Sequence, residues 1–144
     1  MLGSIILGLW RVDTMDKSDL GRYWEETSDR DYITMRNLYD SGDYHWSLFM
    51  GHLVLEKLLK ACYVMNVSEK VPFTHDLLRS ADLAGMGVDE ERADQLDLIT
   101  TFNINARYPD YKQAFYRKCT LEFSARSISR IEEIRTWLKE TLHR

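Results

Sequence analysis

The sequence predicts an all-α protein that folds as an up-down antiparallel helical bundle of four to five helices. Only two prolines and seven glycines interrupt the 144 residues, which favours helices over many short strands. No stretch alternates like a strand over more than four positions. An apolar fraction of 44% over this length suffices for one domain with a substantial core. We expect residues 15–144 to form that domain, and residues 1–14 to be an N-terminal arm or an incorrectly assigned start.

The longest apolar run with a single period, residues 44–66, predicts the central helix of the bundle. Few polar residues interrupt the run, so the helix should be covered by other helices on most of its sides. Gly51 costs roughly 1 kcal/mol of helix propensity against Ala, and it would let another helix approach closely. The apolar residues recur every three or four positions and form one stripe, consisting of Tyr44, Leu48, Gly51, Leu55, Leu58, Leu59 and Cys62.

One helix is expected before the central one, over residues 18–39. Ser18 or Asp19 can serve as its N-cap, because both side chains carry an oxygen that accepts a hydrogen bond from the first turn. The connection over residues 41–43 is a short turn. A turn this short makes the two helices antiparallel neighbours, an αα-hairpin.

Three helices are expected after the central one. Thr74 is expected to cap the first of them, which residues 85–87 with their two glycines should end. The next should start around Asp89, and the chain should leave the helical conformation between residues 103 and 109, because Pro109 restricts the residue before it. A last long helix should run from residue 111 or 118 to 142.

Charge is distributed unevenly along the chain, although the net charge is only −4. Residues 13–43 contain nine acids and four bases, residues 82–110 seven acids and two bases, and residues 111–144 four acids and eight bases. The last segment could neutralise the two acidic ones within the fold or a dimer, or it could present positive charge to a phosphate. Nothing here is specific for DNA, and the apolar run of residues 2–10 is too short to cross a membrane.

The cysteine and histidine spacings predict neither a metal site nor a disulfide. Cys62 and Cys119 are expected to be free thiols in a reducing, cytoplasmic compartment. His45 and His52 share a helix face, but no Asp or Glu repeats their spacing on a partner helix. A Gly-rich phosphate loop is absent as well, so no cofactor is expected.

Three polar clusters carry the candidate functional residues: residues 56–60, 72–76 and 103–110. In the structural interpretation, Glu56 accepts a hydrogen bond from Arg107 or His75, and the buried polar groups satisfy one another. The members of that network are Glu56, Asp76, Asn105 and Asp110. In the functional interpretation, the clusters form an anion pocket in which cations surround a phosphate and a tyrosine ring stacks on a base. The residues of that pocket are Lys57, Lys60, His75, Arg107 and Tyr108.

Four short motifs in order resemble the HEPN domain of prokaryotes, of the type associated with nucleotidyltransferases. The resemblance covers about residues 16–142 and implies a compact helical bundle, usually a homodimer. It also implies a small nucleotidyltransferase as partner, in a two-component unit of the toxin–antitoxin kind. The motifs are Leu38-Tyr39-x-x-Gly42-Asp43-Tyr44, Leu55-Glu56-Lys57-Leu58-Leu59-Lys60-Ala61, Pro72-x-Thr74-His75-Asp76-Leu77 and Asn105-Ala106-Arg107-Tyr108-Pro109-Asp110.

Many members of the broad superfamily that this chain resembles are metal-independent ribonucleases with an Arg followed, after four to six residues, by a His. Here the residues at those distances from Arg107 are Lys, Gln and Ala, and from Arg135 they are Glu, Thr and Leu. The resemblance therefore implies a non-catalytic HEPN protein that binds a nucleotide or a nucleotidyltransferase. Two alternatives stay open: a ribonuclease with a degenerate site that uses His75 with Arg107, and a dimeric scaffold.

Overall fold

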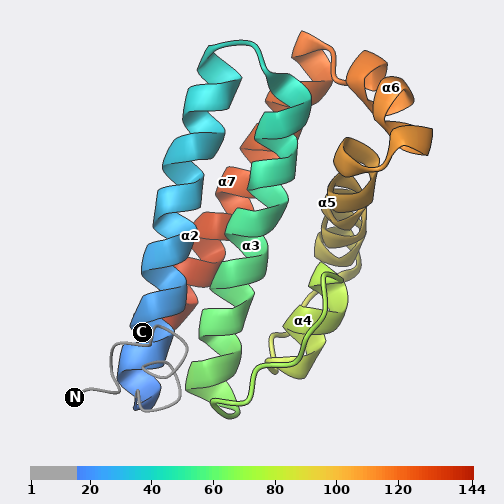
Figure 1. The fold of residues 1–144 in the computed structure, drawn as a ribbon. Helices are drawn as coiled ribbons and strands as arrows, with labels where there is room; N and C mark the ends of the chain where they lie inside the picture. The colour runs from blue at the N-terminus through green and yellow to red at the C-terminus, as the bar shows by residue number, and fades with distance from the viewer. Residues whose placement is uncertain (1–15) are drawn as a thin grey trace.

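The computed structural model describes residues 16–144, and this part of the chain contains six helices and no strand. Figure 1 shows the helices of residues 17–40 and 44–66 side by side, with the long C-terminal helix behind them and the other three helices on the side of residues 44–66 away from residues 17–40. The predicted all-α antiparallel bundle is confirmed. The expected arm at residues 1–14 lies outside the described residues. The helices are α2 (Lys17–Asp40), α3 (Tyr44–Asn66), α4 (Leu77–Leu83), α5 (Glu90–Arg107), α6 (Pro109–Lys118) and α7 (Leu121–Leu142).

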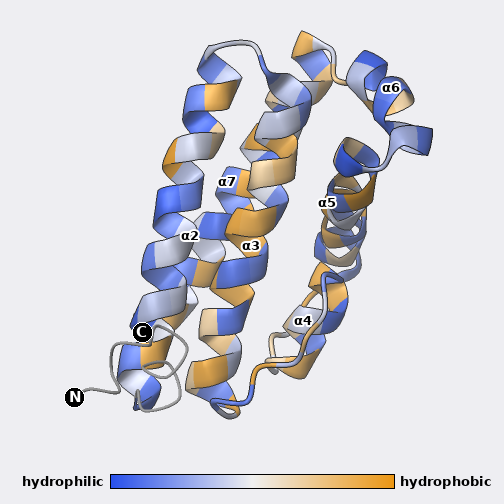
Figure 2. Ribbon diagram, viewed as in Figure 1, coloured by the Kyte–Doolittle hydropathy of each residue, from blue (hydrophilic) through white to orange (hydrophobic). Residues whose placement is uncertain are grey.

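Helix α3 is the centre of the bundle, as predicted, and it contacts α2, α4, α5, α6 and α7. Hydrophobic residues are more frequent on α3 than on α2, where hydrophilic residues dominate (Figure 2). Each fully buried leucine of α3 contributes roughly 1.5–3 kcal/mol relative to an exposed one. The leucines of α3 that are at most 1% exposed are Leu48, Leu55, Leu58 and Leu59.

Gly51 allows the close helix approach that the sequence predicts. A Cβ atom at this position would lie 2.5 Å from Cδ1 of Ile131 on α7 and 3.3 Å from Sδ of Met35 on α2. Both neighbours are fully buried. The missing side chain therefore makes room where α2 and α7 meet α3.

Two predicted helix starts are wrong by a few residues. Asp16, rather than Ser18 or Asp19, caps α2, and its Oδ1 accepts a hydrogen bond from the Asp19 backbone N–H at 2.8 Å. Asp76, rather than Thr74, caps α4. All these residue types make good N-caps, so the local sequence does not choose between them.

The predicted break between residues 103 and 109 is present but shorter than expected, because α5 stays helical through Arg107 and only Tyr108 leaves the helix. Tyr108 is extended, with ψ 132°, and Pro109 begins the separate helix α6. Proline suits the first helical position, since its fixed φ fits and the N–H that it lacks would have no partner there. The predicted last helix is thus two helices, and Thr120 caps the second of them by accepting from the Phe123 N–H at 3.1 Å.

Buried hydroxyl groups tie α2 to α3. Ser28 Oγ donates to the Val54 carbonyl oxygen at 2.7 Å, and Ser47 Oγ donates to the Met35 carbonyl oxygen at 2.8 Å. Both serines are fully buried. These bonds set how the two helices lie against each other, because a buried hydroxyl without a partner would lose about 1–3 kcal/mol.

Both cysteines are free and buried. Burial raises the pKa of the Cys62 thiol to about 12 and that of the Cys119 thiol to about 11. Both groups therefore stay protonated at neutral pH, where a thiol is a poor nucleophile. None of the described helices is both long enough and apolar enough to cross a membrane.

Candidate functional site

A buried carboxylate lies at the centre of the candidate site. Glu56 is 4% exposed, its Oε1 accepts a hydrogen bond from His75 Nδ1 at 2.8 Å, and its Oε2 accepts one from Lys60 Nζ at 3.3 Å. Of the two donors expected for Glu56, His75 is the one observed. The His75 side chain is half exposed, so the carboxylate orients an imidazole that borders solvent.

His52, one turn before Glu56 on α3, forms a hydrogen bond with the backbone of His75. Its side chain is fully buried, and its Nε2 donates to the His75 carbonyl oxygen at 2.9 Å. This bond places the remaining ring proton on Nε2 and leaves Nδ1 without a partner in the described part of the chain. Burial lowers the pKa of His52, and the positive charge of Arg107 acts in the same direction. His52 is therefore neutral and fixes the backbone that carries His75.

Arg107, at the end of α5, is exposed to solvent, and Asn103 fixes its side chain. Its Nε donates to both the backbone oxygen (3.1 Å) and the side-chain Oδ1 (2.9 Å) of Asn103, which is 4% exposed. Its guanidinium carbon lies 5.8 Å from the ring centroid of Phe49 and 5.2 Å from that of Tyr108. Among the described residues no carboxylate pairs with it. Arg107 is exposed, and its two terminal nitrogens form no hydrogen bond to a residue of the described chain, so they remain available as a fork of donors.

Each of the two lysines has a carboxylate partner of its own. Lys57 Nζ pairs with Asp31 on α2, and Lys60 Nζ pairs with Glu56 and lies 4.7 Å above the Trp24 ring. Lys57 follows Glu56 directly, so it is turned by about 100° around the helix axis, toward α2. The candidate anion pocket is therefore not one cage of cations. Lys60, Glu56 and His75 form one group, and Lys57 lies outside it.

The other residues expected in the polar network do not join Glu56. Asp76 is exposed and caps α4, where its Oδ1 accepts from the Arg79 N–H at 3.1 Å. Asp110 is exposed in the first turn of α6, where a negative charge suits the helix dipole. Asn105 is partly buried on α5. Asp76 and Asp110 therefore serve their own helices.

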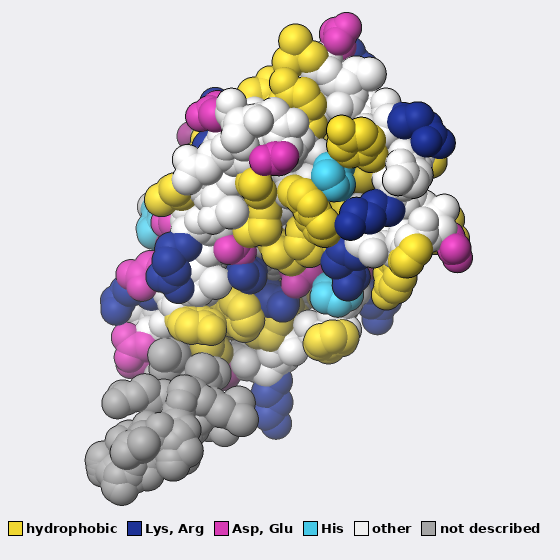
Figure 3. Space-filling view, turned by 45° about the horizontal axis from the view of Figure 1, so that its top comes forward, with side chains coloured by type: hydrophobic (Ala, Val, Ile, Leu, Met, Phe, Trp, Pro, Cys, Tyr) yellow, Lys and Arg dark blue, Asp and Glu magenta, His cyan; other side chains and the backbone are white. Residues whose placement is uncertain are grey.

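Aromatic rings and cations line the face between α3 and α6, which we call the aromatic-basic surface and which consists of Trp46, Phe49, Arg107, Tyr108 and Lys112. Lys112 Nζ lies 4.7 Å above the Trp46 ring, beside the pair of Arg107 and Phe49. Hydrophobic side chains gather on this side of the molecule, with Lys, Arg and His side chains among them (Figure 3). Tyr108 is 48% exposed, so the surface is open.

Sequence reasoning did not include Lys112 in the site, although a signal was present. Trp46 and Phe49 are three residues apart on α3 and therefore share a face. Arg107 and Lys112 lie on the two sides of Pro109. The turn between α5 and α6 places Arg107 over the Phe49 ring and Lys112 over the Trp46 ring, and the sequence alone does not reveal this turn.

Comparison with known proteins places this geometry in a family. The chain matches the family described as HEPN domain over residues 22–141, which includes parts of all six described helices. The crystal structure of TT1696 from Thermus thermophilus is similar, with a TM-score of 0.70 and 22% identity over 83% of this chain and 96% of that one. At this identity the likeness shows the fold alone. A search of curated proteins finds no significant match. Because the family match spans most of the sequence, the chain belongs to the HEPN domain family.

Proposed function

We propose that this HEPN protein binds a nucleotide on the aromatic-basic surface without cleaving RNA. The observation that carries the proposal is Arg107, an exposed guanidinium held in place by buried Asn103 and not neutralised by any carboxylate of the described chain. Such a fork matches the oxygens of a phosphate and binds them with two parallel hydrogen bonds.

The neighbours of Arg107 supply the rest of a nucleotide site. Lys112 adds a second positive charge on the same surface, and its described surroundings hold no carboxylate within ion-pair distance. The exposed Tyr108 ring offers a face for a base, a contact worth about 1–3 kcal/mol in single-stranded nucleic-acid binders. Lys57 and Lys60 already pair with carboxylates, so the proposal assigns the phosphate to Arg107 and Lys112.

Isothermal titration calorimetry with ribonucleoside mono-, di- and triphosphates tests the proposal. Replacing Arg107 by Ala removes a charged hydrogen bond and should weaken binding by about 1.5–3 kcal/mol, or roughly 10- to 150-fold. Arg30→Ala is the matched control, because Arg30 is an exposed arginine on the outer side of α2. Absence of binding for all these nucleotides, or equal affinity in the Arg107→Ala variant, would refute the proposal.

The same proposal includes a small nucleotidyltransferase as partner. A protein that holds a nucleotide has a direct use beside an enzyme class that transfers nucleotides, and an open surface with exposed tyrosine and arginine is typical of protein interfaces. Co-expression with a nucleotidyltransferase encoded in the adjacent reading frame should give a complex that elutes as one species in size-exclusion chromatography. Separate elution of the two proteins would remove this part of the proposal.

One observation favours a second candidate function, a ribonuclease with an unusual site. The Glu56–His75 pair has the arrangement of a general base whose orientation a carboxylate fixes, and it needs no Arg–His spacing along one helix. Cleavage of a ribo-oligonucleotide that the His75→Ala variant does not cleave would support this candidate. An intact ribo-oligonucleotide after incubation with the wild-type protein would exclude it for that substrate.

A further inference from the structure

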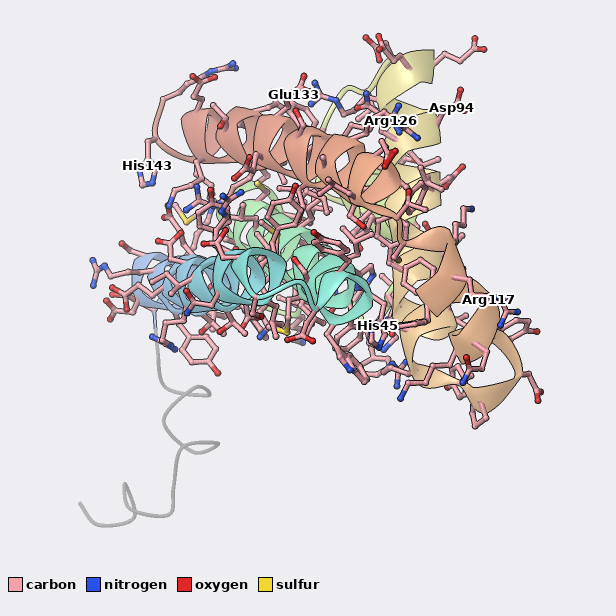
Figure 4. All side chains as sticks on the ribbon, turned by 90° about the horizontal axis from the view of Figure 1, so that it is seen from above. His45, Asp94, Arg117, Arg126, Glu133 and His143 are labelled. Carbon is pink, nitrogen blue, oxygen red and sulfur yellow. The ribbon has the colours of Figure 1, made fainter. Side chains whose placement is uncertain are left out.

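The four histidines of the chain, all of which lie in the described part, differ in how their ring nitrogens are used. His52 is fully buried, and Nδ1 of the partly buried His45 has no hydrogen-bond partner in the described chain. The side chains of His75 and His143 are 50% and 64% exposed, and each pairs with a glutamate. Figure 4 shows His143 and His45 at opposite ends of the molecule. The two exposed histidines can therefore be compared directly.

These two histidines bind their glutamates through opposite ring nitrogens. Nδ1 of His75 lies 2.8 Å from Glu56 Oε1, whereas Nε2 of His143 lies 2.8 Å from Glu25 Oε2. An ionised carboxylate only accepts hydrogen bonds, so each of these ring nitrogens carries a proton. In a neutral ring the lone pair then lies on the other nitrogen, which is Nε2 in His75 and Nδ1 in His143. The lone pair of His75 is thus at the ring edge that is remote from the backbone.

Hydrogen bonds from α3 and α5 fix both the backbone and the ring of His75. His52 of α3 donates to its carbonyl oxygen at 2.9 Å, and Thr100 of α5 accepts from the N–H of Leu77, two residues further on, at 3.0 Å. Glu56 binds Nδ1 of the ring, while Nε2 has no hydrogen-bond partner in the described chain. A group that is already positioned in this way has little freedom to lose when it reacts.

The burial of Glu56 indicates more than a structural role. Glu56 is 4% exposed, and a carboxylate that loses its hydration costs free energy unless its partners compensate. Its two partners are His75, whose side chain is half exposed, and Lys60, whose side chain is 20% exposed. Both could bind water instead, so the carboxylate is not required to satisfy a buried donor. Its negative charge does lie where it stabilises a positive charge that develops on the His75 ring.

We infer that Nε2 of His75 accepts a phosphoryl group from a phosphoramidate, the class of phosphoryl compounds in which phosphorus is bound to nitrogen. The Nε2 lone pair attacks phosphorus and forms an N–P bond, while the P–N bond of the phosphoramidate breaks and its electron pair stays with the amine. The amine nitrogen is already protonated in the phosphoramidate, so it leaves as a neutral amine and no further proton moves. The ring gains the positive charge that the amine loses, and Glu56 balances this charge through the Nδ1–H bond, which stays intact.

The charges around His75 also suit a phosphoryl group. Beyond burial, the charges of His75 and Arg107 both lower the pKa of His52, so both groups lie close to that ring. Arg107 pairs with no carboxylate of the described chain and can therefore attract the phosphoryl oxygens. At His143, by contrast, the neighbouring cation Lys139 already pairs with two carboxylates of α2. The two exposed histidines should therefore differ in reactivity.

Incubation of the full-length protein with potassium phosphoramidate tests the inference, with mass spectrometry to find the modified residue and phosphorus NMR to identify the modified nitrogen. In the wild type, His75 should be phosphorylated at Nε2 at least about tenfold faster than His143, because only His75 combines a positioned ring with a free Nε2. Glu56→Gln removes the charge at nearly constant size and should slow the reaction of His75 at least about tenfold, with both nitrogen isomers formed, because the tautomer is no longer fixed. His143→Gln is the matched control and should leave the reaction of His75 unchanged.

The wild-type protein alone can overturn the inference. It would do so if His75 stayed unmodified, if its Nδ1 were the modified nitrogen, or if His143 reacted as fast as His75. An unchanged rate and isomer in Glu56→Gln, with a circular dichroism spectrum that shows a folded protein, would also overturn it. Neither a nucleotide nor RNA is present in this experiment, so its outcome is independent of the proposed nucleotide binding and of the ribonuclease alternative.

Discussion

Replacing Gly51 by Ala sets two known effects against each other at the centre of the bundle. Alanine adds roughly 1 kcal/mol of helix propensity. Its Cβ would lie 2.5 Å from Ile131 Cδ1, far inside van der Waals contact, in a part of the core where Ile131 is fully buried. Overpacking of this kind lowers the free energy of unfolding by about 1–3 kcal/mol. We therefore expect Gly51→Ala to destabilise the fold by up to about 2 kcal/mol.

A second substitution isolates the steric part of this effect. Ile131→Val removes Cδ1, the atom that the alanine would meet, and alone should lower the free energy of unfolding by about 0.5–1.5 kcal/mol. In the Ile131→Val background, Gly51→Ala should instead be neutral or stabilise the protein by up to about 1 kcal/mol, because the propensity gain remains and the tightest contact is gone, which leaves the 3.3 Å contact with Sδ of the flexible Met35 side chain. The coupling free energy between the two sites should thus be about 1–3 kcal/mol.

Urea unfolding followed by circular dichroism gives the four free energies of this cycle, provided that the m value stays constant. Gly87→Ala is the control, because Gly87 has no atom within 4 Å of an added Cβ and should change stability by less than about 1 kcal/mol. Stabilisation by Gly51→Ala alone, or a coupling below about 0.5 kcal/mol, would refute the steric reasoning.

Three further predictions concern buried polar groups and helix ends. Burial lowers the pKa of His52 below the value of 6.5 for an unfolded chain, so the unfolded state binds more protons and stability falls as the pH drops below 6.5; His52→Gln should flatten the dependence of the urea midpoint on pH between 7 and about 5.5, and an unchanged slope would assign the effect to other groups. Ser28→Ala should lower the free energy of unfolding by about 0.5–1.5 kcal/mol through the lost bond to a carbonyl of α3, and a neutral result would mean that this carbonyl finds another donor. Asp16→Ala should lower the melting temperature, with a loss of about 1 kcal/mol, whereas Ser18→Ala should not; the reverse order would restore the sequence-based cap.

The helix with the most regular spacing of apolar residues was the easiest to predict. Residues 44–66 form α3 in the structure with the bounds expected from the sequence, because almost every turn of this helix contributes an apolar residue to the core. A helix with that pattern has no competing conformation of similar burial. The all-α class followed from the same signal.

The start of α4 shows why helix ends are harder to predict. Thr74 and Asp76 are both suitable caps, and the difference between them arises from contacts distant in the sequence. His52 binds the carbonyl oxygen of His75, and Thr100 on α5 accepts from the N–H of Leu77, which is the first residue of α4. These two bonds hold His75 outside the helix. No property of residues 72–77 alone reveals them.

The candidate site was predictable in its residue types but not in its grouping. Periodicity places Glu56 and Lys57 on adjacent faces of α3 without saying which helix covers each face. Packing of α2 then gives Lys57 a carboxylate partner, Asp31, and removes it from the group around Glu56. In the same way, the unexpected helix α6 brings Lys112 to the rings of α3.

The two protonated cysteines supply a built-in measure of how this fold opens. Cys62 lies in the middle of the bundle, whereas Cys119 lies in the short link between α6 and α7. A thiol reagent can reach Cys119 when α6 detaches from the bundle, but it can reach Cys62 only when the helices packed on α3 move away from it. The ratio of the two alkylation rates therefore reports whether α6 detaches on its own, and a ligand or partner that binds across α6 would slow the first reaction and leave the second unchanged.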